Sequence, residues 1–390
     1  MKIAMLHWAY PPVIGGVETH LVQLCPALVR AGHQVSVLTG SHEGIPQLYI
    51  DRGVQIRRVS LMNLGLLSKK VSASLEGAIA DAVRSYFDES KPDLIHVHNL
   101  HYFSEAHARV VKNEANKRKI PIVLTAHNVW NDRLFMNITR IGAWDHTIAV
   151  SKFIKHALMG YGTPSHDVTV IHHGIDGTPF FDAKPEEAHK LYPQLRGRNV
   201  IFHPARMHVD KGSHIVAQAF RLVKRRIPDA LLVMAGTTDV VDWHNLQEEG
   251  MAKVLELLNH FGLQRDVLVD QYPVERMPLM YAACTLVVYP SIFDEPFGLA
   301  TIEAMSAGKS IIVTPRGGMS EIIKARKNGL IVPSGDPVSL ANAIVRLLKH
   351  PEVASRMGRT GREMFREKYQ LEIMVQDTIA VYNKCLQKYQ

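Results

Sequence analysis

Short apolar runs alternate with longer amphipathic stretches along almost the whole chain, in two successive blocks. The short runs predict buried strands and the longer stretches predict helices. In the first block we expect strands at Ile3–His7, Gln34–Thr39, Val54–Val59, Asp93–His98, Ile120–Ala126, His146–Val150 and Val168–His172. In the second block we expect them at Val200–Pro204, Ala230–Met234, Val267–Asp270, Leu286–Tyr289, Ser310–Val313 and Gly329–Val332. Strands separated by helices of this length predict an α/β fold of parallel, doubly wound, Rossmann-like sheets.

The chain has 390 residues, which is more than one hydrophobic core usually serves, so we expect two domains. The alternation lapses between Gly177 and Arg198, a polar passage with three prolines. We therefore predict a first domain over 1–176, a linker over 177–198 and a second domain over 199–370. Residues 371–390 form a predicted amphipathic helix that packs on its own domain or crosses back to the first.

The composition restricts the partners of the protein. Lysine and arginine number 45 against 37 acidic residues, a formal charge of +8, which suits phosphate groups, an anionic membrane surface or nucleic acid. The basic runs Lys117–Lys119 and Lys224–Arg226 fall at expected helix ends, where they complement the helix dipole, so we expect no nucleic acid partner.

Three widely spaced cysteines indicate a reducing compartment, and no apolar stretch approaches the ~20 residues of a membrane span. The first ten residues lack the features of a signal peptide. These observations predict a cytoplasmic protein.

The loop after the first expected strand contains Gly15 and Gly16 just before a helix. Glycines there allow backbone N–H groups to approach an anion, although a glycine pair is more often only a tight turn. The stretch is not G-x-G-x-x-G, which disfavours a nicotinamide enzyme.

Two cations follow the first strand of the second block. Arg206 offers a planar fork of donors and Lys211 a point charge, so that together they can hold a pyrophosphate without a metal ion. The alternative, two exposed surface cations, is equally probable for this loop taken alone.

A second loop with unusual residues joins the strand Leu286–Tyr289 to a helix. Pro296 suits the first helical position, and Gly298 would let the N–H groups of Phe297 to Leu299 face a phosphate. Glu295 and Glu303 can each accept hydrogen bonds from a vicinal diol, one on a hexose and one on a ribose. Capping would account for Glu295 but not for Glu303 among apolar neighbours.

Taken together, these elements resemble the GT-B fold retaining glycosyltransferases of family 4 (glycosyltransferase group 1 type), over nearly the whole chain. The elements that carry the resemblance are Gly15–Glu18, Thr125–Asn128, Val150-Ser151, Val170–Asp176, Arg206 with Lys211, and Glu295 with Glu303 in the spacing of the family's E-x7-E motif. The resemblance implies two Rossmann-like domains facing a central cleft.

The resemblance also implies residue roles. Arg206 and Lys211 would hold the donor diphosphate, assisted by backbone of Gly16 and of Gly298-Leu299. Glu303 would bind the ribose and Glu295 the 3- and 4-hydroxyls of the transferred sugar. His127 would lie beside the donor sugar. On the donor side, the resemblance also implies Gly15, Tyr272, Met277 and Phe297. On the acceptor side, it implies Glu18 and His98.

Some positions depart from the family pattern. The family usually has asparagine where this chain has His173, and often glycine where it has Asn128 and Asp270. These departures affect the acceptor side and the base contacts and leave the diphosphate clamp intact.

The histidines at 96, 98 and 101 raise the possibility of a metal site, because His96 and His98 lie on one face of a strand and His101 follows. No carboxylate or cysteine completes the set, so we expect no metal ion there and no cofactor besides the nucleotide-diphosphate sugar that serves as co-substrate.

The function that this resemblance implies is metal-independent transfer of a hexose, with retention, from UDP-glucose or UDP-N-acetylglucosamine to a hydroxyl group. A GDP-mannose-dependent mannosyltransferase, a sugar-nucleotide epimerase of the same fold and a non-catalytic binding protein are the alternatives. The acceptor would be a sugar, a glycan or a lipid-linked molecule. Apolar residues at 64–67 and at 130–135 lie next to basic ones, which favours peripheral contact with the inner face of a membrane.

Overall fold

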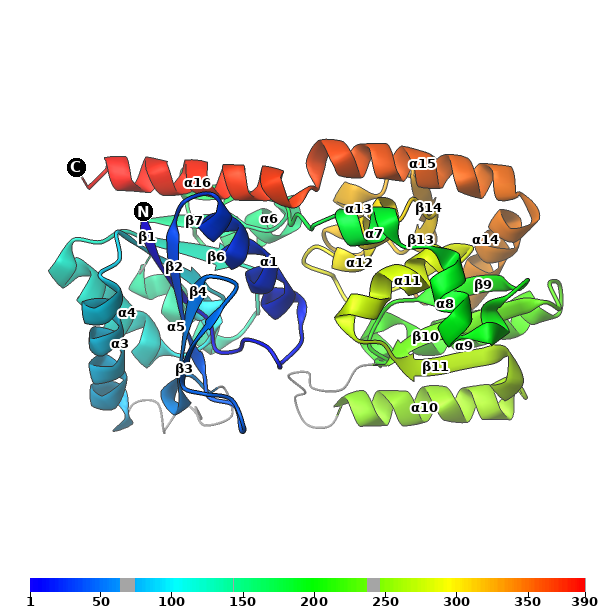
Figure 1. Cartoon of the computed structure of the whole chain (residues 1–390), viewed down its shortest axis with the longest axis horizontal. Helices are drawn as coiled ribbons and strands as arrows, with labels where there is room; N and C mark the ends of the chain where they lie inside the picture. The colour runs from blue at the N-terminus through cyan, green and yellow to red at the C-terminus, as the bar shows by residue number, and fades with distance from the viewer. Residues whose placement is uncertain (64–73, 143, 237–245, 390) are drawn as a thin grey trace. The chain divides into compact units, whose positions relative to one another are not determined.

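The computed structural model describes residues 1–63, 74–142, 144–236 and 246–389 (Figure 1). The chain divides into two compact units. The first unit comprises Met1–His173 together with Leu371–Gln390, and the second comprises Gly174–Gln370. Within the described residues, no helix combines the length and the apolar character needed to cross a membrane.

The first unit is built on a sheet of eight strands among the described residues, in the order β3-β4-β2-β1-β5-β6-β7-β8. Seven strands run parallel, and β3 at the edge runs antiparallel to β4. The strands are β1 (Lys2–Leu6), β2 (Gln34–Gly40), β3 (Leu48–Asp51), β4 (Val54–Val59), β5 (Leu94–His98), β6 (Ile122–Ala126), β7 (His146–Ala149) and β8 (Val168–Val170). The edge strand β3 is not part of the sequence prediction, because its alternation covers only four residues.

Helices cover both faces of this sheet. They are α1 (Gly16–Arg30), α3 (Glu76–Ser90), α4 (Glu105–Arg118), α5 (Arg133–Ile141), α6 (Lys152–Gly160) and α16 (Leu371–Gln387). Val35 and Val37 of β2 share a core with α1 and α16, whereas Ser36 between them hydrogen-bonds Tyr86 of α3 at 2.9 Å. Because side chains alternate across a strand, α3 covers the opposite face from α1 and α16.

The second unit has a parallel sheet of six strands among the described residues, in the order β11-β10-β9-β12-β13-β14. The strands are β9 (Asn199–His203), β10 (Ala230–Gly236), β11 (Val267–Gln271), β12 (Leu286–Tyr289), β13 (Ile311–Val313) and β14 (Gly329–Ile331). All six agree with the predicted strands to within two residues at either end.

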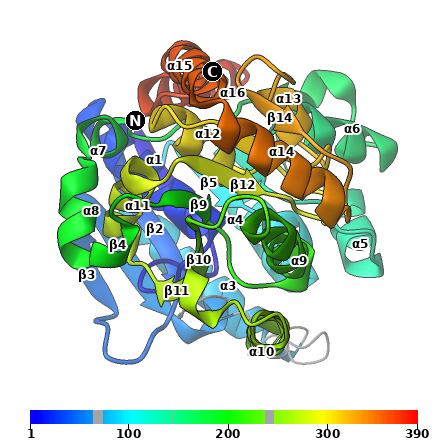
Figure 2. The same ribbon diagram turned by 90° about the vertical axis from the view of Figure 1, so that its right-hand side faces the viewer.

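The helices of the second unit lie on both faces of its sheet (Figure 2). They are α7 (Thr178–Asp182), α8 (Pro185–Leu191), α9 (Ser213–Lys224), α10 (Leu246–His260), α11 (Met277–Ala283), α12 (Leu299–Ser306), α13 (Met319–Ile322), α14 (Pro337–Lys349) and α15 (Pro351–Lys368). Ile201 of β9 packs with α9, α10 and α14, whereas the neighbouring Phe202 faces Tyr281 of α11 with ring centroids 5.1 Å apart.

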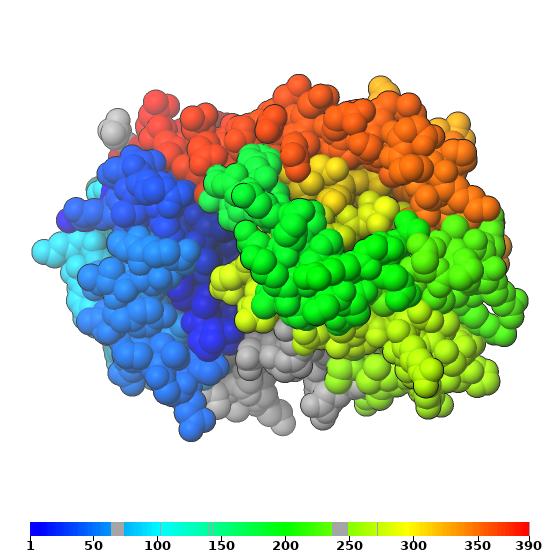
Figure 3. All heavy atoms as spheres, turned by 45° about the vertical axis from the view of Figure 1, so that its right-hand side comes forward, coloured from blue at the N-terminus to red at the C-terminus, as the bar shows by residue number. Residues whose placement is uncertain are grey.

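The passage 177–198, which the sequence suggested as a linker, lies inside the second unit. Its helices α7 and α8 pack against α11, and it forms part of the green surface in Figure 3. The three prolines that suggest a linker instead stand at the start of α7, α8 and a 3-10 turn. There the fixed φ of proline suits the first helical turn.

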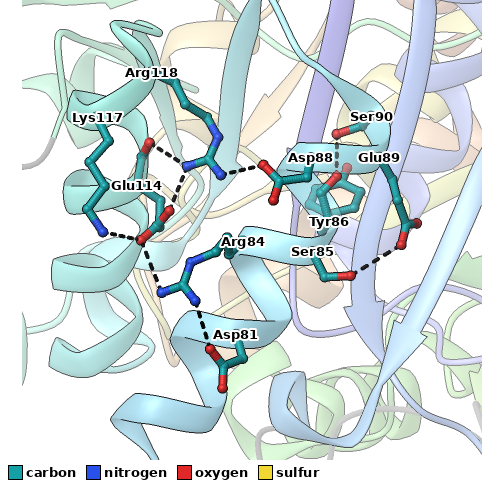
Figure 4. A network of polar contacts seen from close by, with 10 residues as sticks. All are labelled: Asp81, Arg84, Ser85, Tyr86, Asp88, Glu89, Ser90, Glu114, Lys117 and Arg118. Atoms are coloured by element: carbon teal, nitrogen blue, oxygen red, sulfur yellow. Dashed lines mark hydrogen bonds and ion pairs between the residues drawn. The ribbon is translucent and has the colours of Figure 1, made fainter.

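A buried carboxylate joins α3 to α4 (Figure 4). The side chain of Glu114 is 4% exposed and lies 2.6 Å from Arg118, 2.7 Å from Lys117 and 3.8 Å from Arg84. Arg118 also reaches Asp88 of α3 at 2.6 Å. The basic residues at the end of α4 therefore neutralise one buried acid, in addition to lying at the helix terminus.

We expect Glu114→Gln to destabilise the first unit by about 1–3 kcal/mol, because the cations around it lose their shared charged partner in a buried position. Asp81→Asn is the matched control. Asp81 is another partner of Arg84, but the Asp81 side chain is 77% exposed. Its removal should therefore change stability by less than about 1 kcal/mol. Urea denaturation of the two variants and the parent protein measures both. Equal effects would contradict the importance of burial at Glu114.

Candidate functional site

The strand order of each sheet reverses at one point. In the first unit β1 lies between β2 and β5, and in the second β9 lies between β10 and β12, so that connections leave in opposite directions on either side. Ligands of open parallel sheets bind at the carboxyl ends of strands beside such a reversal. The loops after β1, β5, β9 and β12 are therefore the places to look for a site.

In the second unit, these loops bring Lys211 and Glu295 together. Lys211 Nζ lies 2.6 Å from Glu295 Oε1, and the two side chains are 17% and 6% exposed. Ser291 Oγ donates to the same carboxylate oxygen at 2.9 Å. The backbone carbonyl of Asp210 accepts from Ile292 N and from Phe293 N, at 2.9 and 3.2 Å. The loop after β9 is thus fastened to the loop after β12, which fixes the cation relative to the carboxylate.

Arg206 belongs to the same group. Its side chain is exposed, and its charge acts on Tyr289. Burial raises the pKa of Tyr289, and the positive charge of Arg206 opposes that shift. Lys211 Nζ lies 6.0 Å from the centre of the Tyr289 ring. The two cations expected to form the clamp therefore both act on one tyrosine at the end of β12.

The backbone around Glu295 and Gly298 is tightly constrained. A Cβ atom at Gly317 would collide with the backbone carbonyl of Glu295, and Gly318 N donates to that carbonyl at 2.7 Å. Gly298 is left-handed, with φ of 91°, and precedes α12, which begins at Leu299. Pro296 therefore does not occupy the first helical position that the sequence suggested, because the left-handed glycine delays the start of the helix by three residues.

Glu303 lies about one turn into α12. Its Oε2 accepts a hydrogen bond from Tyr281 of α11 at 2.7 Å. Burial raises the pKa of Glu303, and the Tyr281 hydroxyl opposes that shift. Tyr281 thus orients a carboxylate that is partly withdrawn from solvent.

The residues expected around the base lie at the end of β11 and the start of α11. Tyr272 is 5% exposed, and its ring contacts Tyr192 and Phe202 at centroid distances of 5.5 and 6.4 Å. Its hydroxyl is buried, with no hydrogen-bond partner in the described part of the chain. Met277 is the first residue of α11 and is partly exposed.

In the first unit, Gly15 and Gly16 stand at the start of α1. The helix begins at Gly16, and the carboxylate of Glu18 folds back so closely over Gly15 that a Cβ atom there would collide with it. Glu18 Oε1 lies 3.0 Å from His7 Nε2, and both side chains are buried. Glu18 is thereby fixed at the carboxyl end of β1.

His98 ends β5 and His127 follows β6, and their rings meet with Nδ1 of His98 3.0 Å from Nε2 of His127. Asn99 holds the His127 backbone through a 2.8 Å hydrogen bond to its N–H. His20 of α1 and His173 complete the group, with their Nδ1 atoms 3.0 Å apart and the His173 ring stacked on His127 at 5.2 Å. Burial lowers the pKa of all four imidazoles, which keeps them neutral near pH 7.

The histidine set considered from the sequence, at 96, 98 and 101, does not converge. His96 uses both ring nitrogens, at 2.6 Å from the Tyr382 hydroxyl and 2.7 Å from Thr125 Oγ1, and Nε2 of His101 lies 2.7 Å from the Asn128 carbonyl. His96 is therefore occupied by packing contacts that tie α16 to the sheet.

Sequence reasoning did not identify several residues of the two groups. The two glutamates of the second unit, Glu295 and Glu303, are supported by Ser291, Gly317 and Tyr281. The first unit adds two histidines, His7 beside Glu18 and His20 beside His173. Ser291 and Tyr281 carry no motif, but His7 was recognisable as a polar residue directly after a buried strand.

The buried histidines predict an acid-labile protein. Their pKa values are depressed in the folded state, to about 3 for His96 and His173 and about 4 for His101, His107 and His203. The unfolded chain takes up protons first, so stability is fully present above about pH 6.5 and falls as the pH decreases below it. Each such histidine contributes a loss of up to about 1.4 kcal/mol per pH unit.

Urea denaturation between about pH 7.5 and pH 5.5 tests this dependence. His20→Asn should reduce the slope of stability against pH, since one depressed imidazole is removed. A stability that stays constant over this range would contradict the burial of neutral imidazoles.

Comparison with known proteins places the chain in a group. Residues 14–178 match the model of Glycosyltransferase Family 4, and residues 186–364 match that of Glycosyl transferases group 1. A glycosyltransferase of Methanocaldococcus jannaschii is 27% identical over 98% of both chains.

Solved structures show the same fold. A glycosyltransferase from Rickettsia africae superposes with a TM-score of 0.82 at 20% identity, covering 99% of each chain. The HepE protein of Anabaena, solved in complex with UDP-glucose, has a TM-score of 0.78 at 19% identity, covering 98% of this chain and all of that one.

Two parallel-sheet α/β units with charged loops at their strand-order reversals define a GT-B protein that uses a nucleotide-sugar donor. The chain belongs to the family 4 glycosyltransferases.

Proposed function

We propose that this glycosyltransferase moves a hexose from a UDP-sugar, UDP-glucose or UDP-N-acetylglucosamine, to a hydroxyl acceptor with retention of configuration and without a divalent metal cofactor. The observation that carries the proposal is the group of Arg206, Lys211 and Glu295 in the second unit. Both cations follow β9, and Glu295 after β12 holds one of them, Lys211. A diphosphate is the anion that fits this pair of cations.

Lys211 can bind the donor without releasing Glu295. An ammonium group has three hydrogen-bond donors, and one of them is directed to Glu295 Oε1. The others are available to phosphate oxygens, and the exposed guanidinium of Arg206 adds a planar fork. The backbone N–H groups of Phe297, Gly298 and Leu299 lie at the start of α12, where the helix dipole favours an anion.

The two carboxylates would bind the two sugars of the donor. Glu295 accepts from Lys211 and Ser291, and a carboxylate has capacity for about four hydrogen bonds, which leaves room for sugar hydroxyls. Glu303, oriented by Tyr281, would accept the ribose hydroxyls. Tyr272 and Met277 would lie near the base.

The residues of the first unit would serve the transfer step and the acceptor. We assign the contact with the donor sugar to His127, which Asn99 holds through the backbone. Gly15 and Gly16 would approach the diphosphate, and Glu18 and His98 would act on the acceptor side. HepE is described in complexes with UDP, with UDP-glucose, and with UDP and glucose, which supports the choice of donor.

The acceptor we propose is a sugar, a glycan or a lipid-linked molecule. Trp130 is 43% exposed beside α5 and would suit an apolar acceptor or a membrane surface. The apolar residues at 64–67 lie outside the described residues.

We expect Arg206→Ala and Lys211→Met each to lower kcat by about 100-fold, because the leaving diphosphate loses a fixed positive charge as its own charge develops. Lys224→Met is the matched control, since Lys224 pairs with Asp266 at the opposite end of α9, and should retain activity. The rate of transfer is measured as nucleotide release with and without acceptor. A separate thermal-shift measurement with UDP, GDP and ADP identifies the base of the donor nucleotide. Lys211→Met acting at the parental rate would contradict the clamp.

The product should have the same anomeric configuration as the donor. In the group that holds the donor, Glu295 is engaged with Lys211, so we propose that the departing phosphate deprotonates the acceptor hydroxyl on the same face of the sugar. Proton NMR of the first product formed distinguishes the outcomes by the coupling constant of its anomeric proton. An inverted product would exclude this mechanism, and conversion of the donor without any acceptor would indicate an epimerase instead.

A further inference from the structure

Three buried histidines in the first unit carry imidazole nitrogens that no described residue satisfies. His20 Nε2, His98 Nε2 and His127 Nδ1 are buried and find no hydrogen-bond partner among residues 1–63, 74–142, 144–236 and 246–389. A buried polar atom without a hydrogen-bond partner destabilises the fold. Three of them in one cluster indicate that the cluster is arranged for a ligand.

The spacing of the three rings narrows the choice of ligand. One ring nitrogen from each of His20, His98 and His127 lies within 4.8 Å of one from each of the other two. The ring centroids are 4.9 to 5.5 Å apart. A metal ion bound at about 2.0–2.1 Å from each nitrogen requires closer nitrogens, so the rings would have to rotate when the ion binds.

The positions of the three residues suit a coordination site. His98 ends β5, His127 directly follows the neighbouring strand β6, and His20 lies in α1, so all three are carried by or adjoin regular elements. His173 contacts His20 Nδ1 at 3.0 Å and so fixes the orientation of its ring. A second group of this kind, bonded to the other nitrogen, is typical of histidines that ligate metals.

We propose that His20, His98 and His127 together bind one divalent transition-metal ion of the zinc class. Neutral imidazole is the form that coordinates such ions, and a set of three histidines leaves a fourth position open. This set differs from the one considered in the sequence analysis, His96, His98 and His101, with which it shares only His98.

The ion would act as an inhibitor and not as a cofactor of transfer. This consequence rests on the proposed function, in which the His127 ring contacts the donor sugar. A ring that coordinates a metal ion cannot make that contact. The protein would thus lose transferase activity as the site fills.

Metal binding is tested on the full chain without an affinity tag. Equilibrium dialysis should give about one equivalent of Zn²⁺, and Co²⁺ should give visible d–d absorption of a nitrogen-ligated ion. His20→Asn and His98→Asn should each weaken binding at least about tenfold. His107→Asn is the matched control, because His107 is equally buried, carries an unpartnered nitrogen and lies outside the set.

Absence of Zn²⁺ binding by the parent protein, or equal binding by the parent and both variants, overturns the proposal. If the variants do not fold, the melting temperature of the parent protein decides. Zn²⁺ should raise it, since a ligand bound only by the native state stabilises it, and an unchanged value counts against the site.

Inhibition is measured separately, by nucleotide release with increasing Zn²⁺, each variant being compared with its own metal-free rate. The parent and His107→Asn should lose activity in step with occupancy, and His20→Asn should need at least about tenfold more Zn²⁺. If Zn²⁺ binds without slowing transfer, the proposed contact of His127 with the donor sugar is contradicted, but the proposed metal site is not. The two failures are therefore distinguishable.

Discussion

Helices cover both faces of each sheet, so a polar side chain on a strand has to find its partner inside the molecule. His96 of β5 illustrates the requirement, since it is fully buried and bonds Tyr382 and Thr125. Groups that must meet a ligand can lie only where the covering ends, at the carboxyl ends of the strands. The reversal of strand order then decides which of these ends have room between the helices. The chemistry of this glycosyltransferase follows from that restriction.

Under the proposed function, the second unit is preorganised for an anion before any donor arrives. Asp210 holds two loops together through its backbone carbonyl, and Glu295 keeps Lys211 in place. A cation held in this way needs little rearrangement when charge develops on a leaving group, and that is the source of most electrostatic catalysis. The same carboxylate prevents Lys211 from remaining a buried, unpaired charge, which would destabilise the fold. The stability of the fold and the proposed catalysis thus depend on the same pair, Lys211 and Glu295.

The strands could be predicted from the sequence, as could the position of Arg206 and Lys211 directly after a strand, and the reasons are local. A buried parallel strand such as Leu286–Tyr289 is an apolar run, and Arg206 and Lys211 follow β9 directly. Partners from distant segments could not be predicted, because nothing in the sequence near Glu303 points to Tyr281. The linker prediction at 177–198 was drawn from prolines, and the same prolines begin helices that pack on α11. The left-handed Gly298 likewise moved the start of α12 past Pro296.

The helix α16 completes the core of the first unit, although it follows the whole second unit in the chain. Its residues Leu371, Met374 and Tyr382 share a core with β1 and β2, and Tyr382 bonds His96 across 286 positions of sequence. On the ribosome, the second unit is therefore fully synthesised before the first can close its apolar face. Domains generally fold in the order in which they emerge. Here the domain that begins translation lacks part of its core until the second domain has been synthesised.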